Sequence, residues 1–272
     1  MSIWVFSVSV DFGLQLAGWL LSVLLGSEII YDLLGSITFI TVSLGSYSLY
    51  GIGSNVGLLA TTLVVAWAAR LGSFLFYRIL QTGHDSRFEK IRSNPISFFV
   101  AWMMQGVWVL ATLTPVLLVN SSPSHVKTSL TSVQTTQVLV GSAVWTVGFL
   151  FESVADYQKF VFKSTPENAG MFIQSGLWSL CRYPNYFGEM TVWFGMYMIC
   201  TSQLSLDMCG VSLVSPVFVT LLLCYVSGIP LQEKQAWQRW GDNDEYLAYK
   251  QNTNLLIPSI LSNDMLCCSK RQ

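Results

Sequence analysis

The segment 176–189 gathers the densest group of polar side chains that could do chemistry. Arg182 carries a guanidinium that can grip a phosphate through two hydrogen bonds. Pro184 begins a predicted helix, so backbone N–H groups and the positive end of the helix dipole are available to a ligand there. The segment therefore indicates an anion or nucleotide entrance, and an aromatic belt with one snorkelling arginine is the alternative. Its polar members are Arg182, Tyr183, Asn185, Tyr186 and Glu189.

A second polar group lies on one face of a predicted helix that precedes this segment. Glu152 and Asp156 are four residues apart, so their carboxylates share that face. Two carboxylates placed in this way repel each other unless a positive group lies between them or one of them is protonated. Lys159 and Lys163 continue the same face over the next two turns. Such a face suits a cation, or a ligand that offers donors.

Two other segments carry candidate residues. Tyr31 and Asp32 lie at the predicted turn between the first two membrane spans, where an interfacial cap is the alternative role. The stretch 231–252 mixes aromatic residues with alternating charges, which predicts a helix on the membrane surface that acts as a lid or as an anchor. Its aromatic residues are Trp237, Trp240, Tyr246 and Tyr249.

The elements that must position these residues are membrane helices. The chain of 272 residues is 52% hydrophobic and only 11% charged, with a mean hydropathy of +0.51. Soluble domains carry about 25% charged residues, and a membrane span needs about 20 apolar residues. The composition therefore predicts an all-α, polytopic membrane bundle of about seven helices, with residues 1–272 forming a single membrane domain. The predicted spans are 3–25, 33–51, 57–80, 95–119, 136–157, 187–203 and 211–230.

The basic residues predict how the bundle is oriented. With seven spans, all of the 14 Lys and Arg residues except Arg70 and Lys127 fall on one side of the membrane. Because basic residues mark the cytosolic side, the N-terminus is expected outside and the C-terminus in the cytosol. Asn120, which begins an Asn-Ser-Ser acceptor triplet, would then lie on the outer side, close to the membrane.

Several functions find no support in the sequence. A formal net charge of −1 without a basic block argues against a nucleic-acid partner. The 6 cysteines form no CxxC pair and the 2 histidines fall on opposite sides, so neither a metal site nor a disulfide framework is expected. The glycines of segment 51–57 imitate a dinucleotide-binding loop, but they lie in a turn between membrane helices and not in a βαβ unit.

Residues 177–189, Leu-Trp-Ser-Leu-Cys-Arg-Tyr-Pro-Asn-Tyr-Phe-Gly-Glu, resemble the signature of the steroid 5-alpha-reductase C-terminal domain superfamily. The chain as a whole resembles a steroid- and sterol-reductase-like membrane branch of that superfamily, to which isoprenylcysteine methyltransferases are distant kin. The resemblance also covers Tyr31-Asp32-Leu33, Asp85-Ser86-Arg87-Phe88, Asn94-Pro95, the segment 148–156 and the ending 246–258.

The resemblance implies a membrane oxidoreductase that binds NADPH from the cytosolic side. Its lipid-bilayer setting suits a lipophilic substrate, of the steroid, sterol or enone-lipid kind, whose carbon–carbon double bond is reduced. A eukaryotic protein of this kind is expected in the endoplasmic reticulum. The cofactor-binding half implied is 136–260. By position, the implied cofactor-binding residues are Asp156, Lys163, Arg182, Tyr183, Asn185, Tyr186, Glu189, Tyr246 and Tyr249.

The resemblance also implies roles within that set. Asn185 and Glu189 correspond to contacts on the nicotinamide side, and Arg182 would face phosphate. The chain departs from the family pattern at Tyr183, where sterol-reductase relatives commonly have His, and at Lys163, where steroid reductases often have Arg.

The acid that polarises the substrate is a hypothesis from location alone. The candidates for this catalytic role are Tyr31 with Asp32, or Glu152, which stands where steroid reductases have Asn. Two alternative functions remain. One is a lipid or isoprenylcysteine-type methyltransferase that uses S-adenosylmethionine, and the other is a non-catalytic lipid-binding protein of the membrane.

Overall fold

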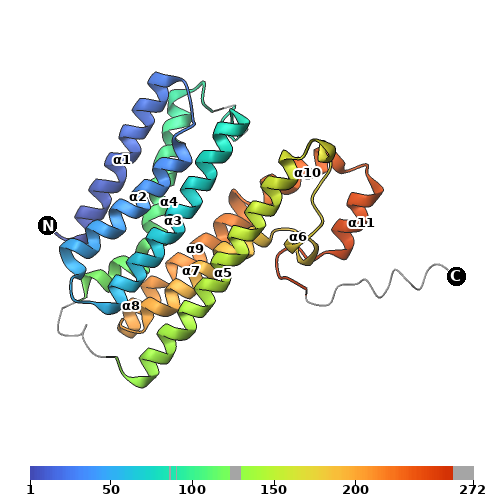
Figure 1. Ribbon diagram of the computed structural model, residues 1–272. Helices are drawn as coiled ribbons and strands as arrows, with labels where there is room; N and C mark the ends of the chain where they lie inside the picture. Colours follow the sequence, from blue (N-terminus) through green and yellow to red (C-terminus); the bar gives the residue numbers. More distant parts are fainter. Residues whose placement is uncertain (86, 90, 123–129, 260–272) are drawn as a thin grey trace. The chain divides into compact units, whose positions relative to one another are not determined.

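The computed structural model describes residues 1–85, 87–89, 91–122 and 130–259. Every regular element within these residues is a helix, so the predicted all-α class is confirmed for the described part of the chain (Figure 1). The chain divides into two compact units. The first contains Met1–Ala143 and Phe194–Phe218, and the second contains Val144–Trp193 and Val219–Gln272.

The first unit is a helical bundle in which α2 packs against α1, α3 and α4. Its helices start at residues suited to that place. Ser2 and Ser54 each accept a hydrogen bond from a backbone N–H of the first turn, and Pro95 occupies a first-turn position of α4. The elements of this unit are α1 (Ile3–Leu25), α2 (Tyr31–Ser46), the π-helical η1 (Tyr47–Gly51), α3 (Asn55–Thr82), α4 (Pro95–Ser121) and α8 (Leu206–Ser212).

The second unit combines parts of three long helices with the short helices that follow them in the chain. It includes α5 from residue 144 on, α7 up to residue 193 and α9 from residue 219 on. The complete elements are α5 (Ser132–Ser164), η3 (Pro166–Asn168), α6 (Leu177–Leu180), α7 (Pro184–Thr201), α9 (Val214–Leu221), η4 (Leu222–Val226), α10 (Ile229–Trp240) and α11 (Asp244–Asn252).

Among the described residues, 6 helical segments are long and apolar enough to cross a membrane. The chain is therefore an integral, multi-pass membrane protein. The helix α7, with 18 residues, occupies the place of the predicted span 187–203 but is not among those segments. The 6 segments are Ile3–Leu25, Tyr31–Gly51, Asn55–Thr82, Pro95–Ser121, Ser132–Ser164 and Leu206–Trp240.

Asn120 is buried inside the first unit, where its side chain is 0% exposed. Its amide Nδ2 donates to Ser46 Oγ at 3.0 Å. Gly51 and Gly57 lie so close that a Cβ on either would stand 2.9 or 2.6 Å from Asn120 Oδ1. These glycines therefore make room for a buried amide, and Asn120 has no surface to which a glycan could be attached in this fold.

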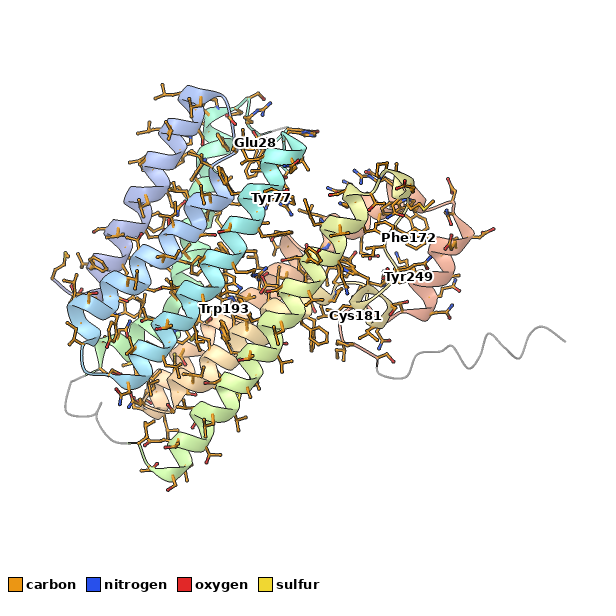
Figure 2. All side chains as sticks on the ribbon, in the orientation of Figure 1. Glu28, Tyr77, Phe172, Cys181, Trp193 and Tyr249 are labelled. Carbon is orange, nitrogen blue, oxygen red and sulfur yellow. The ribbon has the colours of Figure 1, made fainter. Side chains whose placement is uncertain are left out.

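A network of charges closes the end of the first unit at the α1–α2 turn, where Glu28 lies (Figure 2). The Glu28 carboxylate accepts from the Asp85 backbone N–H at 3.0 Å and from Arg92 Nη1 at 2.7 Å. Beside it, Arg87 Nη2 donates to Asp32 at 2.7 Å. These bonds fasten the connection between α3 and α4 to the turn between α1 and α2.

Replacing Glu28 with glutamine should loosen this closure. Burial by itself raises the pKa of Glu28, but the Asp85 N–H and the Arg92 guanidinium outweigh it and hold the pKa below the ordinary value of 4.5. A carboxyl with a lowered pKa stabilises the fold above its unfolded pKa, and this contribution disappears as the pH falls through the folded value. We expect Glu28→Gln to cost about 1–2 kcal/mol at pH 7, since Arg92 is partly in solvent.

Thermal unfolding of the detergent-solubilised protein between pH 7 and pH 3 measures this effect. Glu89→Gln is the matched control, because Glu89 belongs to the same connection but its side chain is 60% exposed. Equal melting temperatures for the two variants at pH 7 would show that the Glu28 bonds add nothing.

Candidate functional site

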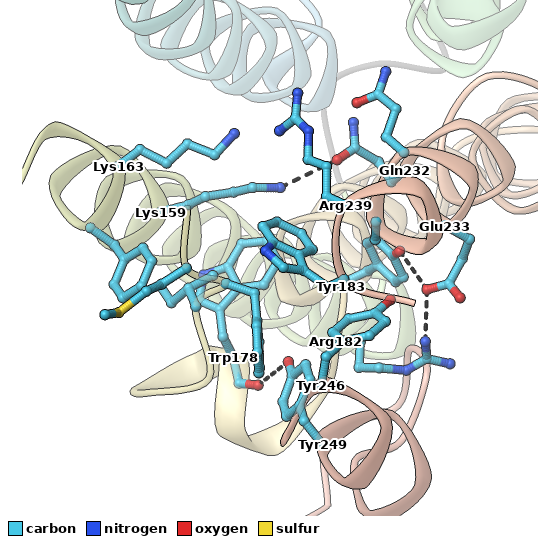
Figure 3. A pocket seen from close by; sticks show the side chains of 17 residues that line it. Lys159, Lys163, Trp178, Arg182, Tyr183, Gln232, Glu233, Arg239, Tyr246 and Tyr249 are labelled. Atoms are coloured by element: carbon cyan, nitrogen blue, oxygen red, sulfur yellow. Dashed lines mark hydrogen bonds and ion pairs between the residues drawn. The ribbon is translucent and has the colours of Figure 1, made fainter. Parts of the chain in front are cut away.

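The second unit contains a pocket of about 700 Å³, open solvent at its mouth included (Figure 3). The pocket is lined by α5, by the chain that follows it and by α10 and α11. Its lining residues are Lys159, Phe162 and Lys163; Met171, Phe172, Ile173, Trp178, Arg182 and Tyr183; Gln232, Glu233, Gln235, Ala236, Arg239 and Trp240; and Tyr246 and Tyr249.

A left-handed glycine positions the inner wall of the pocket. Gly176 has φ of +62°, which a residue with a Cβ rarely adopts, and a Cβ there would stand 2.5 Å from Gln158 Nε2. The turn lets Gln158 Oε1 accept from the Leu177 N–H at 2.9 Å. The Trp178 indole N–H then donates to Ala155 O at 3.1 Å. Trp178 is thereby fixed against α5 with 3% of its surface exposed.

The outer wall depends on a second glycine. Gly228 follows the π-helical η4 and packs against the backbone of Leu223 so closely that there is no room for a Cβ. This close approach lets the chain turn from η4 directly into α10, whose pocket-facing residues include Glu233 and Arg239. The tail after α11 returns to the same region, where Asn254 O accepts from the Arg182 N–H at 2.9 Å.

The Glu233 carboxylate accepts hydrogen bonds from three side chains at the pocket. Its Oε1 accepts from Arg182 Nη1 at 2.7 Å and from the Tyr183 hydroxyl at 2.6 Å. Its Oε2 accepts from Lys250 at 2.8 Å. Burial and the hydrogen bond to Glu233 raise the pKa of Tyr183, so this hydroxyl stays protonated at any physiological pH. One carboxylate thus joins α10, α11 and the segment before α7.

Aromatic rings form the rest of the wall. The Tyr249 hydroxyl donates to Trp178 O at 2.6 Å, and burial raises the pKa of Tyr249. The Phe172 ring centroid lies 5.5 Å from that of Tyr249 and 5.8 Å from that of Trp240. In Figure 2, Phe172 and Tyr249 lie together at one end of the second unit. Flat faces of this kind suit a ligand that contains a planar ring.

The pocket is electropositive. Four of its lining residues are Lys or Arg, whereas Glu233 is the one carboxylate among them. The Lys159 Nζ lies 4.7 Å from the centroid of the Trp178 ring and 3.5 Å from Gln232 Oε1. The cationic lining residues are Lys159, Lys163, Arg182 and Arg239. An anionic ligand that carries an aromatic ring fits this combination.

The structure brings five of the nine predicted cofactor-binding residues to the pocket, namely Lys163, Arg182, Tyr183, Tyr246 and Tyr249. The other four, Asp156, Asn185, Tyr186 and Glu189, are not among the lining residues. The Tyr186 ring stacks on that of Tyr183 with centroids 5.6 Å apart. The Asn185 Oδ1 is buried without a hydrogen-bond partner among the described residues.

The three predicted catalytic residues are not gathered in the pocket. Tyr31 and Asp32 belong to the first unit, where the Tyr31 hydroxyl donates to Ala101 O at 2.8 Å and Asp32 pairs with Arg87. Glu152 lies in the second unit and is 2% exposed. Its backbone packs closely against α7, because a Cβ on Gly188 would stand 2.5 Å from Glu152 N.

The sequence analysis marked Trp240 within the stretch 231–252, but it missed Glu233 and Arg239, which lie on the same helix, α10. Glu233, Arg239 and Trp240 all line the pocket, together with Gln232 and Ala236. Their spacing of three, four and seven residues is that of one helix face, so a search for a polar helical stripe in 229–240 could have found them. Among the described residues, no group of at least 3 His, Cys, Asp or Glu side chains could hold a metal ion.

Comparison with known proteins gives one match. Residues 18–253 match the family described as "Protein of unknown function (DUF1295)". No curated protein and no solved structure matches the chain.

Proposed function

Because the chain belongs to the DUF1295 family of proteins of unknown function, its activity has to be inferred from its own site, and we propose that it is a membrane-embedded reductase. The proposed reaction is the NADPH-dependent reduction of a carbon–carbon double bond in a lipophilic substrate. The observation that carries the proposal is the pocket of the second unit, which combines four cationic side chains with a wall of aromatic rings. A phosphorylated dinucleotide has the complementary chemistry.

The residues present fit the cofactor. The cations suit phosphates, and Trp240 and Tyr249 offer faces to the rings of the bases. The buried Asn185 Oδ1 lacks a donor, and a carboxamide N–H is a donor of the right kind. We propose that these residues, with Glu189 one turn after Asn185, hold NADPH.

The bound cofactor would supply hydride to the β-carbon of an enone or a similar acceptor. The chain itself has to orient both reactants, exclude water and hold a proton near the acceptor oxygen. Glu152 is our candidate for the proton, since it is 2% exposed and belongs to the unit that contains the pocket. The substrate is apolar, so the bilayer is its route of entry.

We propose a membrane topology that gives the pocket access to cytosolic NADPH. With α7 as an additional span, the membrane is crossed seven times, the N-terminus lies outside and the pocket faces the cytosol, where NADPH is found. The charge distribution of the loops supports this orientation. Lys127, one of the two exceptions to the charge rule, lies outside the described residues.

Thermal unfolding of the purified protein in detergent tests the proposal. NADPH should raise the melting temperature, by the equivalent of about 2.7 kcal/mol when its concentration is 100 times the dissociation constant. S-adenosylmethionine should not, because its sulfonium is repelled by an electropositive pocket. Lys163→Glu should abolish the NADPH effect, whereas Lys234→Glu, on the exposed side of α10, should preserve it.

Two results would redirect the assignment. Protection by S-adenosylmethionine and not by NADPH would favour the methyltransferase, whose relatives also place Arg-x-Pro-x-Tyr at a helix start, as Arg182, Pro184 and Tyr186 do here. Protection by neither would favour a non-catalytic lipid-binding protein.

A further inference from the structure

We propose that the phosphate groups of the ligand bind to Arg239, with Lys159 and Lys163 beside it, and not to Arg182. This inference rests on the proposed function and assigns the anionic part of the cofactor to one end of the pocket. It reverses the expectation from the sequence, in which Arg182 faces phosphate.

Arg182 is already neutralised within the protein. Its Nη1 donates to Glu233 at 2.7 Å, and its Nε is buried and inaccessible. Only 13% of the side chain is exposed. A phosphate at this place would compete with a carboxylate that already holds Arg182, Tyr183 and Lys250, and it would meet the negative charge of Glu233 itself. Arg182 therefore acts as a positioning residue that joins the wall before α7 to α10.

Arg239 has the opposite surroundings. It lies on α10 six residues after Glu233, which corresponds to about 9 Å along the helix axis. No carboxylate lies within ion-pair distance of Arg239 among the residues that the structure describes. The side chain is exposed, yet it lines the pocket. Its charge is thus available to a ligand without the loss of an internal ion pair.

Lys159 and Lys163 add positive charge to the end of the pocket at which Arg239 lies. They are four residues apart on α5, so they lie on the same face of the helix, one turn apart. In Figure 3 the side chains of Lys159, Lys163 and Arg239 reach to the same side of the pocket, away from the pair of Arg182 and Glu233. An anion placed beside Lys159, Lys163 and Arg239 is attracted by three positive charges, and a neutral ligand is not.

The opposite end then takes a different part of the ligand. The aromatic wall lies in the same pocket. The end of the pocket formed by Lys159, Lys163 and Arg239 suits a phosphate group. In NADPH this group is either the pyrophosphate bridge or the 2′-phosphate.

The experiment measures binding of NADPH, NADH and inorganic pyrophosphate to the full-length protein in detergent. Arg239→Gln removes the charge from an exposed side chain, and Lys234→Gln is its matched control on the same helix, outside the pocket. The double variant Arg182→Gln with Glu233→Gln removes both partners of the Arg182–Glu233 ion pair, and it leaves Lys250, whose side chain is 32% exposed, without Glu233. We expect Arg239→Gln to weaken NADPH binding about 10- to 100-fold, and the double variant to weaken it less than about threefold.

The results separate the possible sources of the phosphate. A loss confined to NADPH would place the 2′-phosphate at Arg239, and an equal loss for NADH would place the pyrophosphate there; both support the subsite. Unchanged NADPH binding in Arg239→Gln, with a large loss in the double variant, would overturn it. If pyrophosphate protects the wild type but not Arg239→Gln, and neither dinucleotide binds, the subsite stands and the reductase proposal fails. Absence of binding by all three probes overturns both.

Discussion

Replacing Gly188 with alanine should separate α5 from α7 and destroy the site. A Cβ at this position would stand 2.5 Å from Glu152 N and 2.8 Å from Glu152 Cα, and helix backbone cannot move aside as a flexible side chain can. Gly148 approaches α7 in the same way, since its Cβ would stand 2.6 Å from Val192 N. Overpacking of this kind costs about 1–3 kcal/mol, and occasionally more.

The effect on function should exceed the effect on stability. Lys159 and Lys163 belong to α5, whereas Asn185 and Glu189 belong to α7, so a shift between the two helices separates both halves of the proposed cofactor site. A displacement of about 1 Å is enough to lower activity about 100-fold. We therefore expect Gly188→Ala to lose NADPH protection even where the folded protein can still be purified.

Gly13→Ala is the control for this variant. Gly13 lies within α1, and a Cβ there would meet nothing within 4 Å. Because alanine favours helix over glycine, this variant should be neutral or slightly more stable. The melting temperature and the NADPH-induced shift are measured for both. Equal stability and equal shifts would mean that the close approach at Gly188 is not required.

Asn185→Ala should leave the ligand-free protein as stable as the wild type and weaken cofactor binding. The buried Oδ1 has no hydrogen-bond partner among the described residues, so alanine removes an unsatisfied acceptor, which costs the wild type about 1–3 kcal/mol. In the proposed complex the same oxygen accepts from the carboxamide of the cofactor. Its loss should weaken NADPH binding about 10- to 100-fold. Glu189→Ala, one turn later on α7, should likewise abolish NADPH-dependent turnover.

Two measurements separate this role from a structural one. Thermal unfolding with and without NADPH reports stability and binding. The lipid profile reports turnover. It is measured in cells from which the wild-type protein has been deleted and in which the variant is expressed, and lost turnover appears as accumulation of an unsaturated precursor. Thr112→Val is a matched control, because it removes another buried, unpartnered oxygen, in the first unit. Wild-type lipid profiles in both α7 variants would remove Asn185 and Glu189 from the site.

The sequence determined the helices and their membrane setting. An apolar run is a local property of the chain, and so the run 3–25 became α1 (Ile3–Leu25) and the predicted start of a helix at Pro184 became α7. A sequence resemblance is local as well, and the one described above pointed to Lys163, Arg182 and Tyr249, which line the pocket. The sequence also placed the aromatic residues of 231–252, although not their partners.

The tertiary structure decided the electrostatics of the pocket. Arg182 and Glu233 are 51 residues apart in the chain, and no spacing rule foretells that their side chains meet at 2.7 Å. That contact neutralises the arginine that the motif singled out and leaves the positive charge with Arg239, which no motif marks. Burial likewise changed the interpretation of Asn120. The sequence marks this residue as the start of a glycan-acceptor triplet, but in the fold its amide is inaccessible. Charge pairing and burial depend on distances through space, and only the packed chain sets those distances.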